Sequence, residues 1–395
     1  MSTFREELEE FGKFSRSYSG EVWKEKKEGK KIVCYYGSKV PVEIIHASGA
    51  LQYPLFDGGD SEPAEAALPF LLPVANIQSL YQVGQHELGL NPVTPIADLI
   101  IIDCKETDSV RVGDIFEFKG LPVMKLGVPQ DWGNEIAFNY YKLQLSHLKE
   151  KLEKLTGKEI TNESLINSIK KYNRIRQLLN EIGSLRKKNP PVIGGADFIK
   201  LNHYALKNDP DVAVSSLEKL YDRLTGEKSR FSEKVVRLMV AGRGFAFGDY
   251  TLLQMIEKAG GVVVTELLDE GMVHPGEVKL DEAPIEKIAE FYYRGMVPSC
   301  FFTPSFAKRW EEVERLKNEY QASGLLYYML RFDVIYDHET PIFSKRADEK
   351  NVPFTIIESS YDFSRESTET LQTRVESFVK ICDMREVINE KKRLV

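Results

Sequence analysis

Ser38 is the side chain whose position in this 395-residue sequence most directly suggests chemistry. It follows the β-rich run KIVCYY and precedes Pro41, which opens a helical stretch. A hydroxyl at a strand end beside a helix start can hydrogen-bond a carbonyl oxygen and stabilise charge that develops on it. An ordinary turn serine is the competing interpretation.

Two acidic side chains lie, like Ser38, at or just after the end of an apolar run. Asp333 follows the run GLLYYML, and Glu358 ends the run NVPFTIIE. If these runs are parallel strands, both carboxylates lie near the edge of a sheet where ligands bind. They are candidates for acid–base or ligand-binding roles.

The cysteines and glycines exclude several common sites. Cys34, Cys104, Cys300 and Cys382 are too far apart for a zinc pair, a redox pair or a disulfide framework. The histidines also lack metal-ligand spacing. The glycine run GRGFAFG at 242–248 matches neither the dinucleotide fingerprint nor the P-loop, so we expect no nicotinamide cofactor or ATP in this chain.

Composition indicates an ordinary packed protein. Hydrophobic residues make up 42% of the chain and the net charge is −7, which gives no general attraction to nucleic acid or anionic lipid. No stretch has the length of a membrane span or the pattern of a signal peptide. We therefore expect a soluble, cytoplasmic protein.

Apolar runs that alternate with helical patterns must position these residues. Three strands are predicted at 31–34, 97–103 and 121–127, and four more at 235–241, 261–265, 324–330 and 352–358. This alternation is typical of parallel sheets covered on both faces, and the paired runs suggest a duplicated α/β domain. Helical periodicity fills the region between the halves, with a helix start at Thr161. We predict a helical extension (1–30), a first α/β domain (31–133), a helical bridge (134–234) and a second α/β domain (235–395), with the two sheets facing a cleft.

Four segments resemble the 2-hydroxyacyl-CoA dehydratase and benzoyl-CoA reductase family. They are GKKIVCYYGSKVPVEIIHASGAL, NEYQASGLLYYMLRF, NVPFTIIE and ETLQTRVESF, and they occur in the family's order. The resemblance implies two flavodoxin-like domains and a helical part. It also implies a heterodimer of related subunits acting on acyl-CoA thioesters, by radical dehydration or by reduction of an aromatic ring. Family members use four-iron four-sulfur clusters and an ATP-driven activator.

The resemblance also shows where this chain departs from the family. Val74 and Asp333 stand where two cluster thiolates are expected, so Cys104 is the one plausible metal ligand and Asp333 a nonstandard one. Because these clusters need thiolates, we expect the cluster in a partner subunit more than in this chain. Ser38 matches a serine that bonds the thioester carbonyl, and Glu358 matches a recurrent position; these two are the catalytic candidates.

Other functions fit the same residues. A cluster-free acyl-CoA enzyme could use Ser38, Asp333 or Glu358 for hydration, isomerisation or hydrolysis. A non-catalytic acyl-CoA-binding protein would bind without turnover. The aromatic run at 291–302 favours a subunit if it forms a surface helix for a partner, whereas core packing is its competing interpretation.

Overall fold

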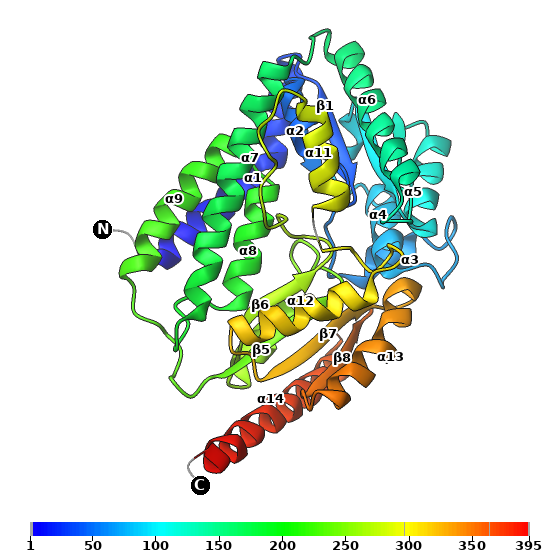
Figure 1. Cartoon of the computed structure of the whole chain (residues 1–395). Coiled ribbons are helices and arrows are strands. Elements are labelled where there is room, and N and C mark those ends of the chain that lie inside the picture. Colours follow the sequence, from blue (N-terminus) through cyan, green and yellow to red (C-terminus); the bar gives the residue numbers. More distant parts are fainter. Residues whose placement is uncertain (1–2, 296, 363, 394–395) are drawn as a thin grey trace.

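The computed structural model describes residues 3–295, 297–362 and 364–393. The predicted end segments include residues 1–2 and 394–395, which lie outside this description. Two four-stranded parallel sheets lie at the centre of the molecule (Figure 1). This arrangement confirms the predicted two-sheet α/β fold.

The two sheets have equivalent strand orders. The first sheet runs β2-β1-β3-β4 and the second β6-β5-β7-β8. The strands of the first sheet are β1 (Ile32–Tyr36), β2 (Leu51–Pro54), β3 (Leu99–Cys104) and β4 (Val123–Gly127). Those of the second are β5 (Val236–Gly242), β6 (Gly261–Leu268), β7 (Gly324–Leu330) and β8 (Phe354–Ser359). The sequence prediction missed β2, a strand of four residues that follows directly on the helical stretch after Pro41.

Helices cover the sheets and connect their strands. In the first half these are α2 (Val42–Ala47), α3 (Ser61–Ala66), α4 (Ile77–Glu87), a 3-10 turn η1 (Thr94–Ile96) and α5 (Thr107–Phe118). The second half contains α10 (Thr251–Lys258), α11 (Pro284–Ala289), α12 (Phe306–Glu319), α13 (Val334–Glu349) and α14 (Arg365–Arg393). Figure 1 shows α14 extending away from the second sheet to the C-terminal end.

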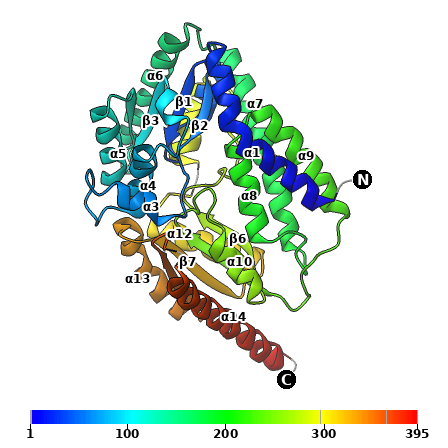
Figure 2. The same ribbon diagram turned by 180° about the vertical axis from the view of Figure 1, so that it is seen from behind.

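A helical layer joins the two halves. It consists of α1 (Phe4–Lys27), α6 (Glu135–Thr156), α7 (Asn162–Ser184), η2 (Leu185–Lys187), α8 (Gly195–Leu206) and α9 (Pro210–Gly226). The side chain of Thr161 accepts a hydrogen bond from the Ser164 amide, which confirms the predicted helix start. Helix α7 packs on α2, whereas α8 packs on β6, so this layer contacts both halves. Helix α1 lies along α8 and α9 (Figure 2).

The aromatic run at 291–302 is core and not a docking helix. A short π-helix, η3 (Glu290–Arg294), places Phe291, Tyr292 and Tyr293 in the buried interior, and Phe301 and Phe302 join them. Position 296 of this run lies outside the described residues. Aromatic rings packed in this way offer no surface to a partner, so the docking interpretation of this run is wrong. No helix in the described ranges is long and apolar enough to span a membrane.

Candidate functional site

The loop after β1 is shaped by a glycine and held by a carboxylate from the neighbouring strand. Gly37 has a φ of 111°, and a Cβ at this position would overlap the Asp103 side chain at the end of β3. The amide of Lys39 donates a hydrogen bond to Asp103 Oδ2 at 3.0 Å. The turn therefore presents Ser38 and Lys39 at the carboxyl edge of the first sheet, as expected for a ligand-binding loop.

Ser38 lies beside a buried histidine. His274 Nε2 is 3.2 Å from the Ser38 carbonyl oxygen. Burial lowers the pKa of His274 to about 3, so the ring is neutral at physiological pH and its Nε2–H donates to that carbonyl. The Ser38 hydroxyl is buried and has no hydrogen-bond partner within the described residues.

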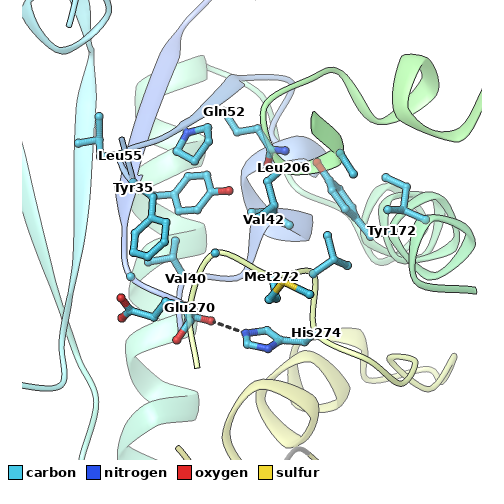
Figure 3. A pocket seen from close by; sticks show the side chains of 18 of the residues that line it. Tyr35, Val40, Val42, Gln52, Leu55, Tyr172, Leu206, Glu270, Met272 and His274 are labelled. Carbon is cyan, nitrogen blue, oxygen red and sulfur yellow. Dashed lines mark hydrogen bonds between the residues drawn. The ribbon is translucent and has the colours of Figure 1, made fainter. Parts of the chain in front are cut away.

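Ser38 lines a cavity of about 80 Å³ between the first sheet, α7, α8 and the loop that follows β6 (Figure 3). We call it the inner cavity. Its wall is mainly apolar and aromatic, with Val40, Val42, Leu55 and Met272 among its members. Such a wall around a few polar groups is typical of a small-molecule site.

Lys39 lines a second, larger cavity of about 480 Å³, the outer cavity, on the other side of residues 272–274. Its side chain is buried, and its ammonium lies 5.3 Å from the centre of the Phe302 ring. No ion pair joins this ammonium to a carboxylate in the part of the chain that the structure describes. Burial, together with the nearby charge of Lys105, lowers the pKa of Lys39 to about 8.

A buried ionic cluster lies between the two halves. Arg243, 1% exposed, contacts Asp333 at 2.8 Å and Glu270 at 2.9 Å, and its distance to Glu106 is 3.5 Å. The ammonium of Lys105 contacts Glu270. We call these five residues the Arg243 cluster. Lys105 and Glu106 follow β3, whereas the other three follow strands of the second sheet, so the cluster ties the halves together.

The cluster holds three carboxylates and two cations, and Asp103 adds a fourth carboxylate 3.8 Å from the Lys105 ammonium. Burial raises the pKa of Asp333, although the Arg243 guanidinium opposes the shift. Protonation of Asp333 would reduce this excess of negative charge. The members of the Arg243 cluster are therefore engaged with one another.

A second buried set lies beside it and begins at Asp269, the residue before Glu270 in the same loop. Arg309, fully buried, donates to Asp269 and Glu339 at 2.6 Å each. The amide of Cys300 also donates to Asp269, at 3.2 Å. Burial raises the pKa of the Cys300 thiol, which argues for a protonated structural cysteine.

The structure does not bring the predicted metal-binding and catalytic residues together. Cys104 ends β3 directly before Lys105 of the Arg243 cluster, but its Sγ lies 3.7 Å from the Ile102 carbonyl oxygen, and Asp103, Lys125 and Asp114 are among its charged neighbours. Asp333 is engaged with Arg243. Glu358 is exposed on β8 and lines neither cavity. Ser38 alone among the four candidates faces a cavity.

These residues do not fit an iron–sulfur cluster. Cys104 offers one thiol, whereas these clusters are held by several thiolates. Cys34 and Cys382 lie in hydrophobic cores, and Val74 has no ligating atom. No group of three or more His, Cys, Asp or Glu residues that could hold a metal ion occurs in residues 3–295, 297–362 and 364–393.

Sequence reasoning missed two residues of this site. Lys39 is adjacent to Ser38 but had no motif of its own, and His274 was one of several scattered histidines. Arg243 lies in the glycine run at 242–248, which matched no phosphate-binding fingerprint, and the structure surrounds it with carboxylates. A charged residue directly after a strand-ending glycine was the available signal in that case.

Comparison with known proteins identifies the family. The family model for 2-hydroxyglutaryl-CoA dehydratase, D-component, matches residues 37–381. The chain belongs to this dehydratase family. The match begins at Gly37, the first residue of the Ser38 loop, and confirms the predicted resemblance.

Individual members of the dehydratase family match along most of their length. The chain is 26% identical to one of the subunits of benzoyl-CoA reductase from Thauera aromatica, covering 84% of this chain and 86% of that protein. It is 25% identical to the beta subunit of (R)-2-hydroxyglutaryl-CoA dehydratase of Acidaminococcus fermentans, covering 94% and 98%. It is also 24% identical to the beta subunit of (R)-phenyllactyl-CoA dehydratase of Clostridium sporogenes, covering 89% and 91%. All three relatives are named as subunits.

Proposed function

We propose that this chain is a subunit of a 2-hydroxyacyl-CoA dehydratase-like or benzoyl-CoA reductase-like complex and binds the acyl-CoA thioester at the Ser38 loop. The observation that carries the proposal is the family match over residues 37–381, combined with a cavity beside Ser38. The complex is proposed to be cytoplasmic.

Ser38 and Lys39 are suited to binding a thioester. The Ser38 hydroxyl is buried and unpaired within the described chain, so it is free to donate to a carbonyl oxygen. The Lys39 ammonium faces the outer cavity, on the other side of residues 272–274, without a paired carboxylate among the described residues, so it is suited to an anionic part of the ligand that reaches that cavity. The neutral His274 holds the loop through the Ser38 backbone and adds no charge.

We further propose that the iron–sulfur cluster belongs to a related partner subunit. Arg243 and its carboxylates occupy the strand ends that carry Asp333, and the thiol of Cys104 lies near the Ile102 carbonyl oxygen. If the partner holds the redox centre and an ATP-dependent activator reduces it, this chain binds the substrate and contributes to the structure of the complex.

Iron and acid-labile sulfide analysis tests this assignment. The chain is purified without oxygen, alone and with a co-expressed related subunit, and an ultraviolet–visible spectrum is recorded for each sample. We expect cluster absorbance in the complex alone, unchanged by Cys104→Ala in this chain. Cluster absorbance in the isolated chain that disappears in Cys104→Ala would contradict the proposal.

Binding and turnover separate the remaining alternatives. If neither sample contains iron but the chain alone converts an acyl-CoA thioester, it is a cluster-free enzyme that uses the same cavity. Tight acyl-CoA binding without turnover in any sample would identify a binding protein. Failure of both CoA and its thioesters to bind would overturn the acyl-CoA assignment.

A further inference from the structure

The inner cavity contains buried hydrogen-bonding atoms that have no partner in the described part of the chain. They include the hydroxyls of Tyr35, Ser38 and Tyr172, the side-chain Oε1 of Gln52 and the Nε of Arg176. Buried polar atoms are normally hydrogen-bonded, because leaving them unpaired costs free energy. Several such atoms around one cavity indicate a ligand that pairs with them.

The sheet places two of these atoms on one face. Gln52 on β2 is the Cα partner of Val33 on β1, and Tyr35 is two residues beyond Val33. Because side chains two residues apart point to the same face, Tyr35 and Gln52 are diagonal neighbours. Tyr172 approaches from α7 and shares with Tyr35 a pKa raised by burial.

These groups lie at one end of the cavity and the Ser38 loop at the other. Figure 3 shows Tyr35, Gln52 and Tyr172 on one side, and Glu270 and His274 on the opposite side. The hydrogen bond of His274 to the Ser38 carbonyl fixes the position of the loop at that second end. A ligand held by Ser38 would therefore extend toward the two tyrosines.

The positive charge at the far end is already balanced by a carboxylate, although one donor of the Arg176 guanidinium, its Nε, has no hydrogen-bond partner within the described residues. The guanidinium of Arg176 borders it but contacts the carboxylate of Glu43, which also accepts a hydrogen bond from Tyr292 at 2.9 Å. A second carboxylate there would be a buried charge without its own cation. A hydroxyl group, in contrast, can donate to Gln52 Oε1 and accept from a tyrosine hydroxyl.

We propose that the inner cavity selects a short acyl group that carries a hydroxyl at the end remote from the thioester. The inference rests on the proposed function, because it takes Ser38 as the group that binds the thioester carbonyl. The cavity, about 80 Å³, is roughly half the size of the ~150 Å³ cavity that admits benzene, which argues against an aryl acyl group.

Isothermal titration calorimetry on the full chain tests this selection, with the partner subunit present where the two co-purify. The ligands are CoA, butyryl-CoA, 2-hydroxybutyryl-CoA, 4-hydroxybutyryl-CoA, succinyl-CoA and benzoyl-CoA. We expect 4-hydroxybutyryl-CoA to bind at least about tenfold more tightly than butyryl-CoA, succinyl-CoA and benzoyl-CoA, since these leave the buried polar atoms unpaired or add a charge or bulk; 2-hydroxybutyryl-CoA shows the separate effect of a hydroxyl beside the thioester.

Substitutions locate the selective groups. Tyr172→Phe and Gln52→Met should each reduce the preference for 4-hydroxybutyryl-CoA over butyryl-CoA to less than about threefold. Tyr293→Phe is the matched control, because its hydroxyl already donates to the Pro129 and Asp131 carbonyls and does not line this cavity. Circular dichroism melts confirm that each variant folds.

The outcomes separate this inference from the function on which it rests. Equal binding of butyryl-CoA and 4-hydroxybutyryl-CoA would overturn the hydroxyl selection and leave the acyl-CoA function standing. A preference that persists in both cavity variants would also overturn it, because the hydroxyl would then be bound elsewhere. If neither CoA nor any thioester binds, the proposed function itself fails.

Discussion

Replacement of Lys39 by methionine should change stability in a pH-dependent way. Burial lowers the pKa of this ammonium from its ordinary 10.5 to about 8, so the folded protein releases the proton more readily than the unfolded chain does. Between these two values the unfolded chain binds more protons, and the wild-type free energy of unfolding must rise with pH. From pH 7 to pH 10 the contribution of this one residue amounts to about 2–3 kcal/mol.

Because Lys39→Met removes the titrating group, its stability relative to wild type should fall by that amount over the same range. The assay is urea unfolding at pH 7, 8.5 and 10, followed by tyrosine fluorescence and circular dichroism. Lys219→Met, which replaces an exposed lysine on α9, is the control and should show no such trend. A constant difference between Lys39→Met and wild type would refute the reasoning and show that the ammonium is well solvated or paired.

Three further experiments with substituted proteins test the surrounding structure. Arg243→Met should lower the free energy of unfolding in urea by about 3–5 kcal/mol, because it leaves buried carboxylates unpaired. Asp333→Asn should lower it much less near pH 7, because burial already favours the protonated carboxyl. Equal losses of stability in the two variants would contradict this account of the cluster. Gly37→Ala should lower the melting temperature far more than Gly29→Ala. Both glycines have a positive φ, but of these two only Gly37 has another side chain where a Cβ would lie. Similar melting temperatures of the two variants would argue against the close contact at Gly37. Ser38→Ala should weaken acyl-CoA binding about two- to tenfold in calorimetry without changing the affinity for free CoA, and an unchanged thioester affinity would remove Ser38 from the site.

Local patterns predicted most of the fold. Continuous apolar runs such as the one at 97–103 correspond to central strands because strands buried on both faces need no polar alternation. Strand β2 was missed because it has four residues, ends in proline and follows directly on a helix-like pattern. For the aromatic run that contains the π-helix at Glu290–Arg294, the sequence fitted both a docking helix and core packing, because an aromatic-rich run does not reveal which of its faces is buried.

The site was less predictable, because its geometry depends on contacts between distant segments. The position of Ser38 followed from a strand end and a turn, both of which are local. The ion pair of Arg243 with Asp333 joins residues 90 positions apart, and no local pattern indicates it. The same holds for Cys104, where sequence gives a thiol after a strand but not the direction in which it points.

The two halves use the same turn for different purposes. Gly37 follows β1 with a φ of 111°, and Gly242 ends β5 with a φ of 112°. The next residue is Ser38 in the first half, with its hydroxyl unpaired in the described chain, and Arg243 in the second, among carboxylates from both halves. Glu270 contacts Arg243 and also lines the inner cavity. A carboxylate of the Arg243 cluster therefore forms part of the cavity wall opposite Tyr35 and Tyr172. The affinity of the cavity should therefore depend on the Arg243 cluster as well as on the residues that touch the ligand.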